Sequence, residues 1–526
     1  MLHTVYGLKG MATAPHHAAS QAGLDILKDG GTAVEAAVAM AATLAVVYPH
    51  MNSIGGDGFW LIAEPDGDVH AIDACGRAAQ AATLDLYAGL DAIPWRGPLA
   101  ANTVAGTISG WALALERSGG ALPLARLLRD AIALAQDGVP VTKGGAEIAQ
   151  NKGEELRVQP GGYADIFEPQ GGPLREGDIL RQPALAATLR HLAQAGLADF
   201  YSGELARRIA ADLEKAGSPV SLADLAQHSA SRPAPLHVDI KGAGLYNTQP
   251  PTQGVASLLI LALFDRLQAA HSGSFEHVHG LVEATKQAFL FRDAQVGDPA
   301  YMTQDCQSLL DDAAKLDVMA ARIDPLRALP WPQPASSGDT VWFGAADNRG
   351  EMVSIIQSTY FEFGAGIVLP QTGITWQNRG SSFRLTANGW NALKPGRKPF
   401  HTLNPAFAQF DDGRRMAYGN MGGEGQPQSQ AAIFSRYARF GEPLQQAVTA
   451  PRWLLGRTWG EDSTSLKIES RMSPVTIAGL AAAGHKIEIM PPFTSVMGHA
   501  GAIVRHAGGL LEGASDPRSD GAVAAW

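Results

Sequence analysis

Hydrophobic and polar positions follow a helical period near the N-terminus of the chain and then change to the period of a strand. Residues 18–48 are Ala-rich with helical spacing, and a glycine turn at 28–31 interrupts them, so they predict two helices packed in a core. The glycine-rich segment 53–60 then leads into residues 61–63, which we expect to pair with residues 69–73 as a hairpin. The chain therefore begins with helices and continues into a sheet.

The same pattern repeats further along the chain. Residues 123–217 are rich in Ala and Leu with helical spacing, and we expect them to cover a sheet. Strands are predicted at 236–240 and 245–247, before a helical run over 255–293. The last third changes character and is rich in strands. Its predicted elements are strands at 340–346, 352–358, 373–377, 405–410 and 415–418, followed by a helix at 428–440.

Composition excludes several classes of protein. With 46% hydrophobic and 17% charged residues, the 526-residue chain has the composition of an ordinary globular protein. Its formal charge of -10, with no dense run of Lys or Arg, argues against binding to nucleic acid. The longest apolar stretch, residues 33–48, contains Glu35 and is shorter than the roughly 20 residues that a membrane helix needs. Neither nucleic acid nor a membrane is an expected partner.

Cysteine usage and the N-terminus indicate a cytoplasmic protein. Cys75 and Cys306 are far apart and belong to no CxxC or Cys/His pattern, so a disulfide framework or zinc site is not expected. Residues 1–10 lack the basic and apolar regions of a signal peptide.

Thr340 is the candidate nucleophile. It follows a stretch rich in Pro, Ser and Gly, residues 328–339, and opens a strand-like run. If the bond between Asp339 and Thr340 is cut, one residue carries a hydroxyl and an α-amine whose pKa of roughly 7.7–8.0 suits a general base. This arrangement predicts the precursor of an N-terminal-nucleophile amidase. The alternative is that Thr340 merely starts a strand after a loop.

Other motifs favour structural roles. Residues 55–58 are glycine-rich but lack the Lys-Ser/Thr of a phosphate-binding P-loop, so we interpret them as a turn. The pairs His16/His17 and His277/His279 have no carboxylate or cysteine set nearby in the sequence. No metal and no cofactor are expected.

The chain resembles the γ-glutamyltransferase family of N-terminal-nucleophile hydrolases along nearly its whole length. The resemblance implies a four-layer αββα sandwich and self-cleavage before Thr340. It also implies a large subunit, 1–339, and a small subunit, 340–526, that stay associated as one structural unit, with a dimer of such heterodimers possible. The matching motifs lie, in order, at residues 36–39, 49–59, 102–106, 290–293, 297–299, 338–340, 363–368, 421–423 and 513–519.

The resemblance also assigns roles around the nucleophile. Gly422 and Gly423 match the family's oxyanion pair, and glycines suit this role because their N–H groups can approach an oxyanion without a Cβ in the way. Ser358 falls where the family places a hydroxyl that hydrogen-bonds the nucleophile.

The sequence departs from the family where a γ-glutamyl group would bind. The family's Arg, Asp and Ser-Ser pair are replaced by Cys75, by Ser382 and by the pair His401 and Thr402. Arg77 and Arg379 nevertheless offer guanidinium groups that can hold a substrate carboxylate in two hydrogen bonds. The expected substrate-binding set is Arg77, Tyr360, Asn378, Arg379, His401 and Thr402, and any of the aromatic residues Trp342, Tyr360, Phe361, Phe363 and Trp376 that face the pocket would shrink it.

These changes resemble the non-glutamyl branch of the family, which includes glutaryl-cephalosporin acylases and oxamate amidohydrolases. The resemblance implies an amidase for a small carboxylate-bearing amide, with oxamate, hydrolysed to oxalate and ammonia in catabolism, as the favoured substrate. The connection over residues 383–400 is shorter than is usual in the family, which favours hydrolysis over transfer. Alternatives are a γ-glutamyltransferase or glutathione hydrolase, a glutaryl-type acylase, and a non-catalytic binding protein that is never processed.

Overall fold

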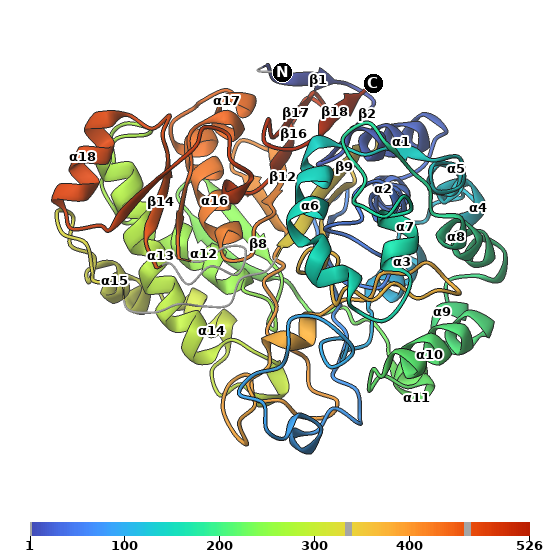
Figure 1. Cartoon of the computed structure of the whole chain (residues 1–526). Coiled ribbons are helices and arrows are strands. Elements are labelled where there is room, and N and C mark those ends of the chain that lie inside the picture. The colour runs from blue at the N-terminus through green and yellow to red at the C-terminus, as the bar shows by residue number, and fades with distance from the viewer. Residues whose placement is uncertain (1–2, 332–338, 457–463) are drawn as a thin grey trace.

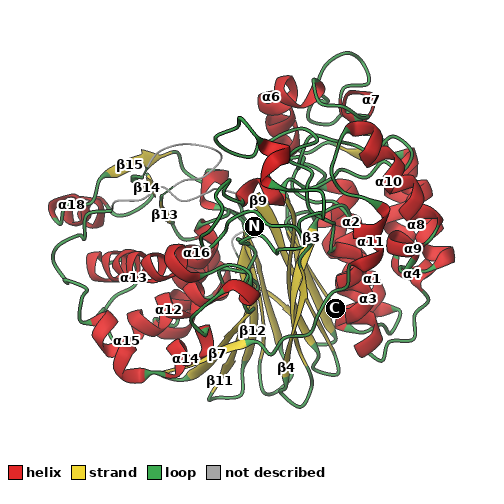
Figure 2. Ribbon diagram, turned by 90° about the horizontal axis from the view of Figure 1, so that it is seen from below, coloured by secondary structure: helices red, strands yellow, loops and turns green. Residues whose placement is uncertain are grey.

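Two β-sheets lie face to face at the centre of the molecule, with helices on both outer sides (Figures 1 and 2). The computed structural model describes residues 3–331, 339–456 and 464–526. The chain ends meet, because Leu8 N–H donates to Trp526 O at 3.0 Å. The arrangement is the four-layer αββα sandwich that the sequence predicted.

The six-stranded sheet mixes strands from both sides of the predicted cleavage bond. Strand β9, which contains that bond between its first two residues, and β10, which follows it, lie in the middle of the sheet between β2 and β3, which precede it. All pairs in this sheet are antiparallel. In spatial order its strands are β18 (Ala522–Ala525), β2 (Gly10–Ala14), β9 (Asp339–Asp347), β10 (Met352–Tyr360), β3 (Asp57–Ala63) and β4 (Val69–Ala74).

The seven-stranded sheet is mixed in the same way, because the early strands β8 and β7 extend it beyond β11. Cutting the chain before Thr340 would therefore leave two pieces that share the hydrogen bonds of both sheets. In spatial order its strands are β1 (Val5–Gly7), β17 (Leu511–Ser515), β16 (Ala500–Arg505), β12 (Arg415–Asn420), β11 (Ala406–Phe410), β8 (Ala243–Asn247) and β7 (Leu236–Ile240).

Helices cover the outer face of each sheet. On the six-stranded sheet lie α1 (His17–Lys28), α2 (Ala33–Val47) and α3 (Thr107–Arg117). On the seven-stranded sheet lie α12 (Gly254–Asp265) and α16 (Gly425–Phe434), and α13 (Phe275–Gln295) packs on these two helices. Each helical layer closes one large hydrophobic core against its sheet, and a third, smaller core lies between the two sheets.

Smaller elements surround these layers. The remaining helices are α4 (Leu124–Leu127), α5 (Arg129–Asp137), α6 (Lys143–Arg157), α7 (Tyr163–Phe167), α8 (Pro183–Ala195), α9 (Asp199–Ser202), α10 (Glu204–Ala216), α11 (Leu222–Gln227), α14 (Cys306–Asp311), α15 (Ala313–Ala320), α17 (Leu444–Thr449) and α18 (Pro474–Ala482). The remaining strands are β5 (Val139–Pro140) with β6 (Ile179–Leu180), and β13 (Trp453–Leu455), β14 (Leu466–Glu469) and β15 (Ile487–Met490). None of the helices in the described ranges has the length and apolar character needed to cross a bilayer.

Helix α2 shows how local sequence sets an element. The Thr32 hydroxyl accepts from Glu35 N–H at 3.0 Å, and the Glu35 carboxylate accepts from Thr32 N–H at 2.8 Å, which is a capping box. Every residue of α2 is buried, because the sheet lies on one side of it and α5 on the other. A helix that is apolar all round requires such a central position.

The structure corrects three of the predicted elements. Residues 373–377 form single bridges to two different segments and no strand, because Thr375 pairs with Val368 whereas Trp376 pairs with Gly55. The helical run predicted over 255–293 is two helices, and the second begins where the Ser274 side chain caps it. The helices between 124 and 216 pack largely on α2 and on one another and do not cover the sheet directly.

Trp342 is a buried aromatic side chain that lies between the two sheets. Its indole N–H donates to the Ser354 hydroxyl at 3.0 Å. Glycines leave room for the ring: a Cβ on Gly419 would lie 2.0 Å from Trp342 Cδ1, and one on Gly501 would lie 2.4 Å from its Cζ3. The close approach of the two sheets here therefore depends on residues without side chains.

Gly419→Ala is expected to destabilise the protein by about 1–3 kcal/mol, because the added methyl group overlaps the buried Trp342 ring. Chemical or thermal unfolding measures the change. Gly508→Ala is the matched control, since a Cβ there meets nothing within 4 Å. Equal free energies of unfolding for the two variants would contradict the conclusion that Gly419 leaves room for the Trp342 ring.

Candidate active site

Thr340 lies near the start of β9, in the middle of the six-stranded sheet, and is fully buried. Its hydroxyl accepts a hydrogen bond from the side-chain amide of Gln426 at 3.0 Å. The preceding residues 332–338 and the Asp339 side chain lie outside the described part of the chain, although the Asp339 backbone pairs with Tyr360. The predicted nucleophile is thus a residue of the six-stranded sheet that is hydrogen-bonded to α16, a helix that packs on the seven-stranded sheet.

Ser358 lies opposite Thr340 because strand β10 is irregular there. Val341 pairs with Gln357 and Asp339 pairs with Tyr360, so Ser358 and Thr359 together face the single residue Thr340, as in a β-bulge. The Ser358 hydroxyl accepts from Tyr360 N–H at 2.8 Å, which fixes its orientation. The structure therefore brings Ser358 and Thr340 onto adjacent strands.

Gly422 and Gly423 form the turn between β12 and α16. Both have positive φ, 116° and 51°, which favours glycine. Both are buried, and no hydrogen bond between described residues uses the N–H of either one. Buried N–H groups without an acceptor are rare, and a pair at the start of a helix is suited to an oxyanion. Gln426, on the first turn of the same helix, contacts Thr340.

A buried polar network holds this glycine turn. The Gln253 side-chain amide donates to Gly423 O and to Thr402 O, each at 2.7 Å. Its carbonyl oxygen accepts from Arg292 at 2.9 Å, and Arg292 also reaches the Glu424 carboxylate at 3.3 Å. Gln253 therefore links the candidate oxyanion turn to the segment that carries His401 and Thr402.

Arg379 is a buried cation next to these groups. Its guanidinium lies 3.5 Å from the centre of the Tyr360 ring and donates to the Thr402 hydroxyl at 2.9 Å. No carboxylate of the described residues forms an ion pair with it, and its Nε–H has no hydrogen-bond partner among them. Burial lowers its pKa to about 10, so it remains charged at neutral pH. Buried charges are normally paired, and a carboxylate is the natural partner for this one.

Tyr360 has an unusual backbone. Its φ of 85° lies in the left-handed region, which costs a non-glycine residue about 1–3 kcal/mol and is commonest at functional sites. The residue follows the bulge opposite Thr340, and its ring lies on Arg379. Tyr360 therefore connects the nucleophile strand to the arginine.

Asp57 and His401 form a buried pair behind Arg379. His401 Nε2 lies 3.1 Å from Asp57 Oδ2, while Asp57 Oδ1 accepts from the N–H groups of Gly76 and Gly106 at 3.0 Å each. Burial raises the pKa of Asp57 to about 7, although these hydrogen bonds oppose the shift, and burial holds the pKa of His401 well below its usual range. Asp57 belongs to the glycine-rich segment 55–58, which the sequence predicts to be a turn, and its carboxyl contacts His401.

Asp57 gives an expected pH dependence of stability. In the unfolded chain this carboxyl ionises near pH 3.8, whereas in the folded protein it keeps its proton until about pH 7. The folded state binds more protons in this window, so the free energy of unfolding falls as pH rises from about 4 to 7. Asp57→Asn is expected to flatten this slope in unfolding titrations, whereas Asp66→Asn, at an exposed position, leaves it unchanged. An unchanged slope in Asp57→Asn would contradict the assigned pKa.

Arg77 and Asn378 lie differently from the rest of the predicted binding set. The Arg77 side chain is 53% exposed, donates to Gly396 O at 3.0 Å and lies 3.8 Å from the Asp298 carboxylate. Asn378 uses its side chain to hold backbone, accepting from Phe361 N–H and donating to Trp95 O. The structure thus groups Tyr360, Arg379, His401 and Thr402, whereas Arg77 has partners of its own.

Two buried clusters have the residue types of a metal site. Asp57, Cys75 and His401 have ligand atoms within 4.8 Å of one another, as do His279, Glu283 and His485. Burial raises the pKa of the Cys75 thiol well above its usual value, which opposes the thiolate that a metal needs. In the second cluster the Lys286 ammonium lies 2.6 Å from Glu283, and His279 hydrogen-bonds His485. Neither set fits a metal well.

Three residues in or near the site were missed at the sequence level. Gln426 could have been found as a glutamine one helical turn beyond the glycine pair. Gln253 and Asp57 gave no such signal, because their partners, Gly423 and His401, are more than 100 residues away in sequence.

Known proteins resemble the chain along nearly its whole length. Residues 19–526 match the gamma-glutamyltranspeptidase family model. The chain is 55% identical to the oxamate amidohydrolase proenzyme of Klebsiella pneumoniae, over 98% of each chain, and 41% identical to a glutathione hydrolase-like proenzyme of Bacillus subtilis, over 99% of each. Among solved structures, a cephalosporin acylase from Bacillus halodurans superposes with a TM-score of 0.92 at 34% identity, covering 100% of this chain and 97% of that one. The chain belongs to the gamma-glutamyltranspeptidase family of N-terminal-nucleophile hydrolases.

Proposed function

We propose that this protein is a self-processing amidohydrolase that converts oxamate to oxalate and ammonia. The observation that carries the proposal is the buried guanidinium of Arg379, which forms no ion pair with a described carboxylate and lies on the ring of Tyr360, whose backbone pairs with Asp339, the residue before Thr340. Because Tyr360 links Arg379 to the start of strand β9, we expect a substrate whose carboxylate lies directly beside its scissile amide. The 55% identical oxamate amidohydrolase proenzyme supports the choice of substrate.

The reaction begins once the bond between Asp339 and Thr340 is cut. The freed α-amine takes the proton of the Thr340 hydroxyl, and Oγ1 attacks the amide carbonyl carbon to give a tetrahedral oxyanion. The N–H groups of Gly422 and Gly423 donate to that oxyanion. The protonated amine then passes its proton to the leaving nitrogen, so that ammonia departs and an ester to Thr340 remains. Water, deprotonated by the same amine, hydrolyses this ester and releases oxalate.

Arg379 supplies the binding energy in this scheme. Its guanidinium pairs with the substrate carboxylate and is oriented by the Tyr360 ring and the Thr402 hydroxyl. His401 is neutral because burial lowers its pKa, so it adds no second positive charge.

Processing divides the chain into subunits 1–339 and 340–526. The relatives named above are described as proenzymes, which supports cleavage of a precursor. Strands of both subunits alternate in both sheets, so the pieces remain one folded unit after cleavage.

The substrate is tested by ammonia release from oxamate, glutamine, glutathione and a glutaryl amide, with purified, processed protein. Oxamate is expected to be turned over fastest, since Arg379 lies so close to the nucleophile strand. Release from glutathione or glutamine at a comparable rate would instead favour glutathione hydrolase activity, the alternative raised by the Bacillus subtilis relative.

A further inference from the structure

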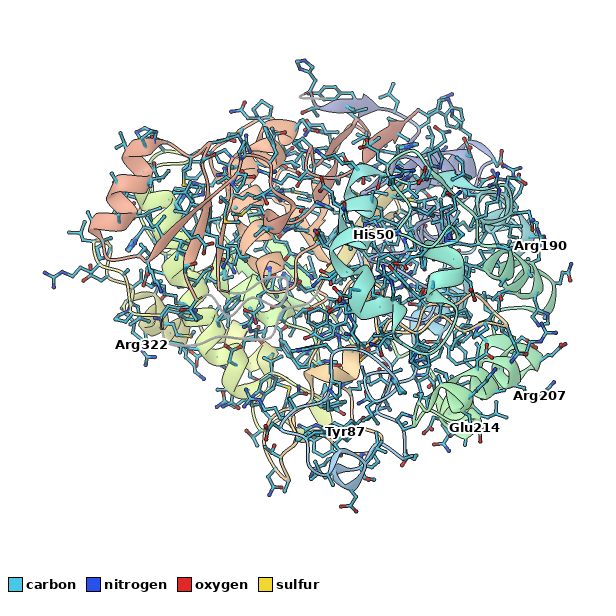
Figure 3. All side chains as sticks on the ribbon, in the orientation of Figure 1. His50, Tyr87, Arg190, Arg207, Glu214 and Arg322 are labelled. Atoms are coloured by element: carbon cyan, nitrogen blue, oxygen red, sulfur yellow. The ribbon has the colours of Figure 1, made fainter. Side chains whose placement is uncertain are left out.

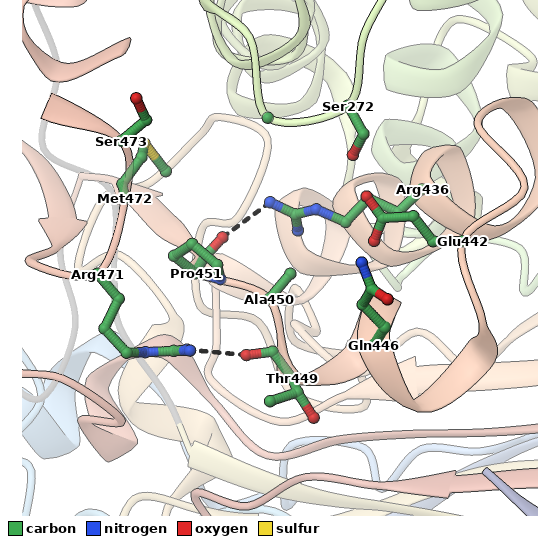
Figure 4. Close-up of a pocket in the computed structure, with 11 residues that line it drawn as sticks. Ser272, Arg436, Glu442, Gln446, Thr449, Ala450, Pro451, Arg471, Met472 and Ser473 are labelled. Carbon is green, nitrogen blue, oxygen red and sulfur yellow. Dashed lines mark hydrogen bonds between the residues drawn. The ribbon is translucent and has the colours of Figure 1, made fainter. Parts of the chain in front are cut away.

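A polar cavity lies beyond the C-terminal end of helix α16, whereas the candidate oxyanion turn precedes that helix. Figure 4 shows the residues that line the cavity. Gly423 precedes α16, whereas Arg436 follows it in a π-helical turn, η4 (Ser435–Arg439), that lines the cavity. Thirteen residues at 1.5 Å per residue place the two about 20 Å apart along the helix. The cavity has a volume of about 510 Å³. Residues from three segments of the chain, 272–273, 436–451 and 471–473, line it.

Arg436 is the most buried charged group of this cavity, with 2% of its surface exposed. One of its terminal nitrogens donates to Pro451 O at 2.8 Å, and the other, Nη1, has no hydrogen-bond partner among the described residues. Burial lowers its pKa to about 10, which leaves it charged at neutral pH. A buried guanidinium with an unused donor is an anion-binding feature.

Of the neighbouring carboxylates, Glu442 acts on the charge of Arg436, although the two side chains form no ion pair. Close by, the two carboxylates of Glu469 and Asp516 already pair with three other arginines. The guanidinium groups of Arg471, Arg518 and Arg436 donate hydrogen bonds to the backbone carbonyl oxygens of Thr449, Ala450 and Pro451, respectively. The surplus positive charge therefore lies at the cavity wall. The three other arginines are Arg452, Arg471 and Arg518.

The cavity also carries a group of opposite character. Glu442 lines it together with Gln446, and Glu442 Oε2 has no hydrogen-bond partner in the described part of the chain. Figure 4 shows Glu442 and Gln446 beside Arg436, and Arg471 across the 449–451 segment from them. Glu442 would repel a simple anion, whereas a molecule that carries both charges can pair with Arg436 and with Glu442.

We propose that this cavity binds a small zwitterion of the amino-acid type, with its carboxylate on Arg436 and its ammonium on Glu442. Each end of such a ligand gains a charge-assisted hydrogen bond with an atom, Arg436 Nη1 or Glu442 Oε2, that otherwise lacks one. The site is separate from the Thr340 centre and does not depend on the reaction proposed for it.

Isothermal titration calorimetry with L-alanine, propionate and propylamine tests the site on the full-length protein. L-alanine is expected to bind at least about tenfold more tightly than propionate or propylamine, since only it engages both walls. Arg436→Gln is expected to weaken L-alanine binding at least about tenfold, and Glu442→Gln is expected to weaken L-alanine but not propionate.

Surface substitutions provide the matched controls. Arg207→Gln and Glu214→Gln remove the same charges from the exposed face of α10 (Figure 3) and are expected to leave binding unchanged. Cooperative thermal unfolding shows that each variant is folded, and the half-buried Glu442 provides a second test if Arg436→Gln does not fold.

The proposal is overturned if wild-type protein binds none of the three probes, because the unused N–H of Arg436 would then be hydrogen-bonded to an internal water and not to a ligand. It is also overturned if L-alanine binds equally well to wild type and to Arg436→Gln, since the binding would then lie elsewhere. Inorganic phosphate that binds more tightly than L-alanine would replace the zwitterion by a simple anion and contradict the role of Glu442.

Discussion

Thr340→Ala is expected to leave the chain uncut and to reduce amide hydrolysis by at least about 10⁴-fold. The variant lacks both the hydroxyl that attacks the precursor bond and the one that attacks the substrate. Denaturing gel electrophoresis should show a single full-length chain, where wild type gives fragments that end at Asp339 and begin at Thr340. Ammonia release from oxamate measures the second effect.

Two further variants sharpen this result. Thr340→Ser keeps a hydroxyl and is expected to be processed with partial activity, whereas Thr386→Ala, in an exposed loop, should behave like wild type. A fully active, uncut Thr340→Ala protein would exclude the N-terminal-nucleophile mechanism. It would leave the alternative that the fold serves binding alone.

Arg379→Met is expected to lower kcat/KM for oxamate by about 10²- to 10³-fold, equivalent to about 3–4 kcal/mol. The substrate carboxylate would lose the buried cation proposed to bind it, and the methionine cannot replace that charge. Because Arg379 also donates to Thr402 and to Phe400 O, some loss of activity is expected with any substrate. The ratio of oxamate to acetamide turnover separates the two effects, since acetamide has no carboxylate.

Arg77→Gln is the matched comparison, because the sequence offered Arg77 and Arg379 as equal candidates. The Arg77 guanidinium is half exposed and already contacts Asp298 and Gly396, so we expect kcat/KM to change less than about threefold. A larger loss in Arg77→Gln than in Arg379→Met would reverse the assignment and place the carboxylate at the edge of the site.

Much of the architecture follows from local sequence. The helices α1 and α2, the β3–β4 hairpin and the strands around Thr340 are read from periodicity and turn residues, because these signals act over a few residues. The irregular segment 373–377 is not read in this way, because single bridges to distant segments decide it. Tertiary contacts override propensity at such positions. The break between α12 and α13 has a local signal, the Ser274 cap, which the prediction of one helical run missed.

The sequence by itself determined the family, and it predicted the candidate nucleophile Thr340, the candidate partner Ser358 and the candidate oxyanion pair 422–423, because each belongs to a short, ordered motif. Only the tertiary structure decided which arginine is a buried, unpaired cation beside the nucleophile strand, and that Gln253, Asp57 and Gln426 hold the site. Burial and charge pairing are properties of residues distant in sequence, and folding alone brings those residues together.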